Sequence, residues 1–333
     1  MSDFQENKAL VLNFHEALDI ASGDAITDAL RRHTIDDYHW RGMHPFDEHH
    51  GADAVAEVFW KPFRHSFTSV QRRTDVFFAG LNDVDGLSSE WVCSMGHLMG
   101  LFDHAWLGIP PTGKIGFLRY AEFNQIANGK IRETAFFCDI ISVMQQAGLR
   151  PLPPQTGAAI ITPGPLTHDG LLHTQQDPQE GAKTLALINQ LIADLTLTYE
   201  PSPERRLARC WHNDMAWFGP AGIGATYTRE RYRKQHQDPF RGGLRDIVFN
   251  GHLCKMAEGR YGGFFGWPNL TMKSRGGFLG LPACDQSTEM RVVDIYRREG
   301  EKLAENWIFI DLLHFLHKQG LDLLGRMRES RVD

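Results

Sequence analysis

Two aspartates stand in apolar segments, where a carboxylate is costly to bury. Asp139 lies within ETAFFCDII and Asp311 within ENWIFIDLL. Burial raises the pKa of a carboxyl group toward the range in which it can move protons to and from carbon. Each aspartate also comes just before a short segment of helical pattern, and aspartate is a favoured N-cap residue. The sequence therefore leaves two compatible roles open for both side chains, acid/base catalyst and helix cap.

A second acid accompanies each aspartate on the preceding strand. Asn128-Gly129 is a strong signal for a two-residue hairpin, and pairing outward from this turn predicts that Glu122 shares a sheet face with Asp139. The two carboxylates would then lie roughly 13 Å apart, at about 3.4 Å per residue. They would line one pocket without sharing a proton directly. Asp294 has the same place relative to Asp311.

Aromatic side chains are expected around these acids. Alternation along the strands supplies Tyr120 and Phe137 in the first half and Trp307 and Phe309 in the second. Aromatic rings are more often core than ligand platform. Trp307 is the strongest candidate for a pocket wall, because it shares a strand face with Asp311, and such a wall suits a flat apolar ligand.

The elements that must position these residues follow one order in both halves. Helices are predicted at residues 4–20, 51–67, 179–197 and 229–237. Strands are predicted at 76–79, 89–101, 115–126 and 131–141, and again at 247–255, 261–267, 286–296 and 302–312. Helices followed by a run of antiparallel strands indicate an α+β fold. We expect a strongly curved sheet wrapped around helices, with a pocket between them.

Both halves end in the same segment. Residues 107–149 align without a gap on residues 279–321, so that Lys130 faces Lys302 and Asp139 faces Asp311. The chain is therefore a tandem duplication of one domain. We expect a first domain at residues 1–150, a linker rich in proline and glycine at 151–176 and a second domain at 177–333.

Composition excludes several classes of protein. The 333 residues carry a formal charge of −6, which argues against nucleic-acid binding. Five scattered cysteines without a CxxC pair indicate reduced thiols in a cytoplasmic protein. We expect no signal peptide and no membrane span, because no apolar run is long enough for either.

The densest group of potential metal ligands consists of His44, Asp47, Glu48, His49 and His50. These residues precede a predicted helix in a loop, and zinc sites usually draw their ligands from helical or CxxC-type spacing. Negative charge is favourable beside a helix N-terminus. The favoured interpretation is a polar loop at a pocket rim, which His44 would reach from the strand at 38–41, and we expect no metal.

The motifs SMGH, WLGIPPTGK and LRYAEFNQIANGKIRETAFFCDIISVMQQAGL resemble the SnoaL-like polyketide cyclase family, which belongs to the nuclear transport factor 2-like superfamily. The second half resembles it more weakly, in SRGGFLGLPACDQ and VVDIYRREGEKLAENWIFIDLLHFLHKQG. The resemblance spans about residues 7–148 and 183–324. It implies two tandem cone-shaped α+β barrels, each a curved, mostly antiparallel sheet wrapped on helices.

The resemblance also implies a chemistry. In the family's cyclases the aspartate of the last strand is the acid/base, and the matching positions here are Asp139 and Asp311. These cyclases also use a histidine near that aspartate, whereas residues 115–138 and 287–310 contain none. His97 and His104 in the first half, or His252 in the second, would be substitutes. The richer histidine content of the first half favours it as the chemical site.

The expected function is that of a cofactor-free cyclase, isomerase or lyase acting on a small apolar or carbonyl-containing compound. Glu122 and Asp294 would assist the two catalytic aspartates, and the double substitution of Asp139 and Asp311 by Asn would abolish turnover. The alternative is a non-catalytic module of the same fold that binds a small ligand or a protein. The superfamily's habit of pairing through the open sheet face predicts an internal pseudo-dimer of the two domains, and further homo-oligomerisation is consistent with it.

Overall fold

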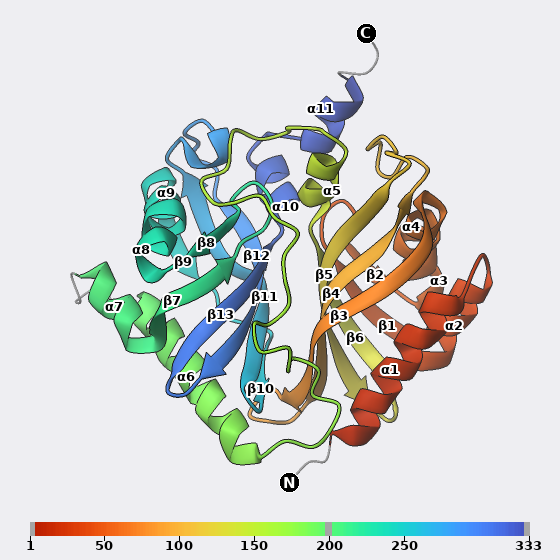
Figure 1. Cartoon of the computed structure of the whole chain (residues 1–333). Helices are drawn as coiled ribbons and strands as arrows, with labels where there is room; N and C mark the ends of the chain where they lie inside the picture. Colours follow the sequence, from red (N-terminus) through yellow and green to blue (C-terminus); the bar gives the residue numbers. More distant parts are fainter. Residues whose placement is uncertain (1–3, 197–201, 330–333) are drawn as a thin grey trace. The chain divides into compact units, whose positions relative to one another are not determined.

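The computed structural model describes residues 4–196 and 202–329, and the chain forms two compact units (Figure 1). The first unit runs to Pro151 and adds Leu166–Gln175 and the segment from Asp322. The second unit comprises Leu152–Pro165 and Gln176–Leu321. The segment predicted as a linker is thus divided between the units, Leu152–Pro165 with the second and Leu166–Gln175 with the first.

The first unit packs helices against a six-stranded sheet. Its helical segments are α1 (Gln5–Ile20), α2 (Ala25–His33), α3 (Ala52–Val55), the π-helix η1 (Ala56–Trp60), α4 (Lys61–Ser66), α5 (Ile140–Gln146) and α11 (Leu323–Glu329). Its strands are β1 (Thr34–Gly42), β2 (Glu48–His50), β3 (Phe67–Leu81), β4 (Glu90–Phe102), β5 (Ile115–Ala127) and β6 (Lys130–Cys138). The strand order is β2-β1-β6-β5-β4-β3, in which β1 and β6 run parallel and the other pairs antiparallel.

The second unit repeats this plan. Its helical segments are α6 (Pro178–Thr196), α7 (Pro203–Cys210), α8 (Arg229–Tyr232), the π-helix η2 (Arg233–Gln237), α9 (Asp238–Gly243), the short 3₁₀ turn η3 (Phe278–Gly280) and α10 (Leu312–Lys318). Its strands are β7 (Trp211–Phe218), β8 (Ala225–Tyr227), β9 (Leu244–Phe249), β10 (Cys254–Glu258), β11 (Tyr261–Ser274), β12 (Thr288–Glu299) and β13 (Lys302–Ile310). The sheet order is β10-β11-β12-β13-β7-β8, with β9 pairing β11 beside β10.

The expected α+β class and the two tandem domains are confirmed by these sheets. The amphipathic pattern of α1 buries Val11, Phe14 and Leu18 against β3 and β4. Asn128 and Gly129 both adopt positive φ, as a type I′ hairpin requires. The strand predicted at residues 247–255 is instead two strands, β9 and β10. Leu197, the predicted end of a helix, lies outside the described residues.

No helix within residues 4–196 and 202–329 is both long and apolar enough to cross a membrane.

Candidate functional site

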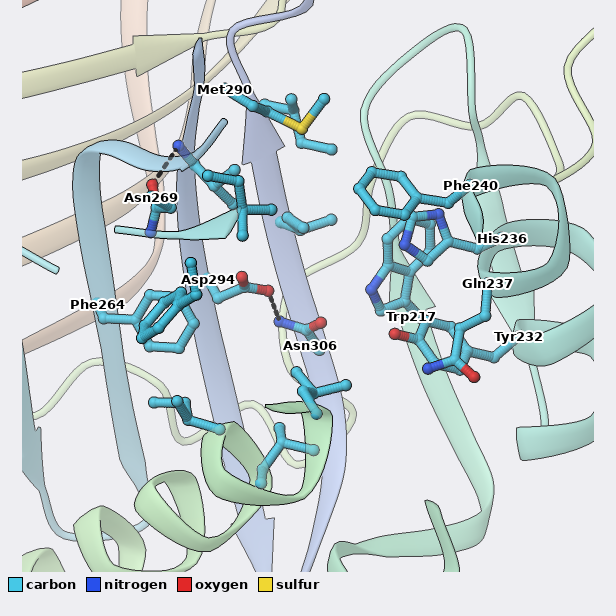
Figure 2. Close-up of a pocket in the computed structure, with 18 of the residues that line it drawn as sticks. Trp217, Tyr232, His236, Gln237, Phe240, Phe264, Asn269, Met290, Asp294 and Asn306 are labelled. Carbon is cyan, nitrogen blue, oxygen red and sulfur yellow. Dashed lines mark hydrogen bonds between the residues drawn. The ribbon is translucent and has the colours of Figure 1, made fainter. Parts of the chain in front are cut away.

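A cavity of about 520 Å³ opens inside the second unit. Its floor is the face of β12 and β13 that carries Asp294 and Asn306, and its walls come from α6, α7 and the helical segment α8–η2–α9 (Figure 2). Most of the floor and one end of the cavity have an apolar surface, formed by Leu191, Leu207, Met290, Ile308 and Ile310. A volume of this size and a mostly apolar lining with a few polar groups are typical of small-molecule sites.

Asp294 is the carboxyl group of this cavity. It is only 8% exposed, and the side-chain amide of Asn306 donates a hydrogen bond of 3.0 Å to its Oδ1 (Figure 2). The same amide nitrogen lies 3.1 Å from the carbonyl oxygen of Ile295. Tyr296, two residues along the same strand face, also hydrogen-bonds the Asp294 carboxyl.

Burial decides the protonation of Asp294. Loss of water raises the pKa of its carboxyl group to about 7, and the hydrogen bonds from Asn306 and Tyr296 oppose this rise only in part. No ion pair to Asp294 is seen among the residues that the structure describes. Near neutral pH the group is therefore divided between its acid and base forms, as a general acid/base requires.

Aromatic rings form two walls beside Asp294. On the helical side, His236 stacks on Trp217 with ring centroids 4.2 Å apart. On the sheet side, His252 stacks on Phe264 at 4.0 Å. Burial lowers the pKa of His236 to about 3 and that of His252 to about 4, so both imidazoles are neutral. These two stacked pairs therefore carry no fixed charge, and among the described residues the cationic group in the cavity lining is Arg241 of α9.

The tautomer of His252 is fixed by its neighbour Asn269. The amide oxygen of Asn269 accepts from the backbone N–H of Val292 at 2.8 Å, which leaves its amide nitrogen to donate to Nδ1 of His252 at 3.1 Å. Asn269 occupies a break in the pairing of β11 with β12, where the register shifts between Gly266 and Leu270. The amide thereby replaces a missing backbone partner and orients the histidine ring.

The helical side also presents Tyr232, Gln237 and Arg241 to the cavity. Tyr232 and Gln237 point toward the sheet side that carries Asp294 and Asn306 (Figure 2). Burial raises the pKa of the Tyr232 phenol, and a hydrogen bond from Gln237 works in the opposite direction. Asp294 is close enough to interact electrostatically with Tyr232.

Asp311 lies on the other side of the sheet. Its Oδ1 accepts from the backbone N–H of His314 at 3.1 Å, so it caps α10, and its Oδ2 lies 3.5 Å from the Arg291 guanidinium. Trp307 and Phe309 share this face and do not line the cavity. The indole N–H of Trp307 instead donates to the carbonyl oxygen of Pro163 at 2.9 Å.

Asp139 has the equivalent position in the first unit. Its side chain accepts from the backbone N–H of Ser142 at 2.9 Å and caps α5. Burial lowers the pKa of the Arg119 guanidinium to about 10, and the nearby Asp139 carboxylate counteracts the fall. The cap, one of the two roles left open by the sequence, is thus present for both aspartates. Phe137 lies on the same face of the sheet as Asp139.

The predicted shared face of Glu122 and Asp139 is wrong. Pairing outward from Asn128-Gly129 shifts by one residue between Ile126 and Gln125, because Arg132 is an extra residue in β6. A shift of one residue turns every later side chain to the opposite face. Glu122 therefore pairs with Phe136, and the second unit has the corresponding shift at Ala304, which separates Asp294 from Asp311.

Glu122 occupies the position of Asp294 in the first unit, but its surroundings are charged. It hydrogen-bonds the ring of His15 and accepts from the side-chain amide of Asn124 at 3.0 Å. Burial would raise its pKa, but His15 and the Arg72 guanidinium outweigh burial and hold it well below the usual range. Glu122 is therefore ionised at neutral pH, in contrast to Asp294, while burial lowers the pKa of its hydrogen-bond partner His15.

Tyr120 lies on the same interior face as Glu122. It is buried, its hydroxyl is 2.8 Å from Ser94 Oγ, and the Arg72 guanidinium lies over its ring with its central carbon 5.2 Å from the centroid. Tyr120 thus belongs to a packed polar core and not to an open wall.

The three histidines proposed for the first unit lie apart from Glu122. His97 pairs with Arg119 on the face of Asp139, and its Nδ1 is 3.6 Å from Asp75. His104 stacks on His65, and its Nδ1 lies 3.0 Å from the carbonyl oxygen of that residue. His44 Nδ1 is 3.7 Å from Asp47. Within the described part of the chain, no three His, Cys, Asp or Glu side chains converge as metal ligands would.

The sequence missed several residues of the cavity. Tyr232, His236 and Phe240 recur every four residues in the otherwise charged segment RERYRKQHQDPF, which is the spacing of one helix face. That pattern could have marked them as inward-facing. Nothing local marks Asn269 and Asn306, because their roles depend on a sheet irregularity and on the facing strand.

No protein-family model matches this sequence, and no curated protein does either. Among solved structures, the chain is similar to a protein from Jannaschia sp. CCS1 proposed to be a SnoaL-like polyketide cyclase, with 18% identity, coverage of 46% of this chain and 95% of that one, and a TM-score of 0.36. A nuclear transport factor 2-like protein from Burkholderia xenovorans LB400 has 13% identity, 42% and 97% coverage and a TM-score of 0.34. A protein from Streptomyces antibioticus proposed to be a polyketide cyclase has 15% identity, 42% and 97% coverage and a TM-score of 0.35. Similarity at this level carries no information on activity.

Proposed function

We propose that the second unit is a cofactor-free acid/base enzyme for a small carbonyl compound, with Asp294 as the group that moves the proton. The observation that carries this proposal is a buried carboxyl group with a pKa of about 7 in a mostly apolar cavity. Perturbed carboxyl groups in clefts are typical of catalytic sites. Isomerases, cyclases and some lyases share this first step, removal of a proton from the carbon beside a carbonyl group.

The proposal assigns Asp294 the role that the sequence suggested for Asp311. Asp311 remains buried with Arg291 and the start of α10, and that arrangement favours a structural role. In the first unit, Glu122 is held ionised by His15 and Arg72, which leaves it a weak base. The proposal therefore assigns the chemistry to the second unit, although the first unit is richer in histidine.

The test uses 2-tetralone, a small aromatic ketone whose protons beside the carbonyl group exchange with deuterium when a base removes them. The wild-type protein in D2O is expected to accelerate this exchange, followed by proton NMR. Asp294→Asn, which cannot take up the proton, is expected to lower the rate by about 100-fold or more. Asp214→Asn on the exposed part of β7 is the matched control and should leave the rate unchanged.

Two results separate this proposal from its competitors. Exchange that survives Asp294→Asn but disappears in the double variant Asp139→Asn and Asp311→Asn would return the chemistry to the helix-capping aspartates. Binding of 2-tetralone without any exchange above the buffer rate would reject the acid/base function for this ketone and favour a ligand-binding module.

A further inference from the structure

The two units carry the same helical insertion with opposite contents. In the first unit α3, η1 and α4 follow one another, and in the second α8, η2 and α9 do so with identical lengths. Both insertions place a proline and a phenylalanine at the same positions, in KPFR and DPFR. A π-helical turn is rare and occurs mostly at functional sites. Its presence in both units allows a position-by-position comparison.

The comparison isolates three polar residues of the second unit. Val55, Phe59 and Trp60 of the first unit correspond to Tyr232, His236 and Gln237 of the second. The first set is apolar and fully or almost fully buried. The second set lines the cavity. A packed apolar core would not require any of these three polar side chains. Their presence therefore indicates a ligand of the cavity with polar groups of its own.

Ring contacts show how the first unit fills the corresponding space. Phe59 packs on Phe136 with centroids 4.8 Å apart, and Trp60 packs on Phe136 at 6.0 Å. In the second unit the position of Phe136 is taken by the smaller Ile308. Three large rings of the first unit, Phe59, Trp60 and Phe136, are thus replaced by the smaller side chains of His236, Gln237 and Ile308, which line the cavity together with Tyr232.

The hydrogen-bonding direction at Tyr232 suits a ligand oxygen. Gln237 stabilises the phenolate form of Tyr232, so its amide N–H donates to the phenolic oxygen. Among the described residues, no acceptor for the Tyr232 O–H is seen. The hydroxyl belongs to the wall across the cavity from Asp294 (Figure 2). The oxygen of a carbonyl compound bound between the two walls would accept this hydrogen bond while the neighbouring carbon faces Asp294.

We infer that Tyr232 is the hydrogen-bond donor to the carbonyl oxygen of the compound from which Asp294 removes a proton, and that Gln237 positions it. This inference rests on the proposed function. In the step, the carbon–hydrogen bond breaks and the proton passes to the Asp294 carboxylate. The electron pair moves to the carbonyl oxygen, which becomes an enolate oxygen held by the Tyr232 O–H. Return of a proton from Asp294 to carbon completes an isomerisation or exchange without any redox change.

The test compares the binding of 2-naphthol and naphthalene, two flat ligands that differ by one hydroxyl group. 2-Naphthol is an analogue of the enol of 2-tetralone. Affinities are measured by fluorescence titration at pH 6, where 2-naphthol is neutral. Tyr232→Phe is expected to weaken 2-naphthol binding by about fivefold or more and to leave naphthalene binding unchanged. Tyr227→Phe on the 60%-exposed Tyr227 of β8 is the matched control and should change neither affinity.

The ratio of the 2-naphthol affinity to the naphthalene affinity tests the inference independently of folding and of the proposed function. Gln237→Leu should lower the ratio to a smaller extent than Tyr232→Phe, whereas a purely structural role would weaken both ligands equally. A ratio that Tyr232→Phe leaves unchanged would overturn the inference, even if exchange of 2-tetralone still depends on Asp294. Conversely, absence of exchange in the wild-type protein rejects the proposed function, while a lowered ratio still identifies Tyr232 as the donor to a bound oxygen.

Discussion

At the scale of single residues, one sheet position carries a carboxyl group with opposite behaviour in the two units. Asp294 has no ion pair among the described residues, and burial raises its pKa to about 7. Glu122 is even more deeply buried, but His15 and Arg72 hold its pKa well below the usual range. The contrast shows that neighbours, and not the position in the sheet, determine whether such a carboxyl group titrates near neutrality.

The raised pKa of Asp294 predicts a pH-dependent cost to stability. The folded state keeps the proton up to about pH 7, whereas the ordinary value is 3.8, so between these values the folded state binds more protons than the unfolded state. The free energy of unfolding should therefore fall as pH rises from 4 to 7, by at most about 4 kcal/mol. Asp294→Asn removes this dependence and should be more stable than the wild type at pH 8.

Urea unfolding at pH 5 and pH 8 measures this effect. The stability of Asp294→Asn relative to the wild type should rise by up to about 3 kcal/mol between pH 5 and pH 8. An equal difference at both values would mean that Asp294 does not retain its proton in the folded protein. Glu122→Gln should lower the free energy of unfolding by nearly the same amount at pH 5 and pH 8, because the stability that a depressed pKa contributes is lost only as pH falls below the ordinary value of 4.5.

At the scale of elements, a single extra residue in each final hairpin determines on which face of the sheet each acidic side chain lies. The sequence predicted the hairpin at Asn128-Gly129 correctly, because the turn depends on two local residues that accept positive φ. It did not predict the bulge at Arg132, since an inserted residue in a strand leaves the alternating pattern almost intact on either side. That one-residue shift moved Glu122 to the opposite face from Asp139, and Asp294 from Asp311.

The contacts of two helix-capping aspartates predict that their replacement by alanine lowers the free energy of unfolding by different amounts. Asp311→Ala removes both the cap of α10 and the partner of Arg291, so it should lower the free energy of unfolding by about 2 kcal/mol or more. Asp177→Ala removes a cap only, since Asp177 is exposed and accepts from the backbone N–H of Gln179 at 2.9 Å, and it should cost about 1 kcal/mol. Urea titration followed by circular dichroism measures both losses, and equal losses would contradict the role of Arg291.

At the scale of the whole chain, duplication kept the fold and changed the interiors. The α+β class, the two domains and most strands follow from the repeated segment and its alternating pattern, which are local properties of the sequence. The location of the cavity does not, because it depends on facing positions such as Phe136 and Ile308 that only the folded sheet brings opposite the helical insertion. The same limit applies to Asn269, whose role arises from a break in strand pairing.

Unequal interiors predict one ligand per chain. The first unit fills the space opposite its insertion with Phe59, Trp60 and Phe136, whereas the second leaves about 520 Å³. Isothermal titration with 2-naphthol should therefore give a stoichiometry of one. Two equivalent sites per chain would contradict the assignment of binding to the second unit alone.

The central claim, that Asp294 is the base of the cavity, is tested most directly by the pH dependence of 2-tetralone exchange in the wild-type protein and in Asp294→Asn. A base must be ionised to act, so the wild-type rate should fall as pH drops below about 7 and reach a plateau above it. Asp294→Asn should lack both the plateau and the titration. A variant that keeps the wild-type rate and the same pH profile would contradict the claim.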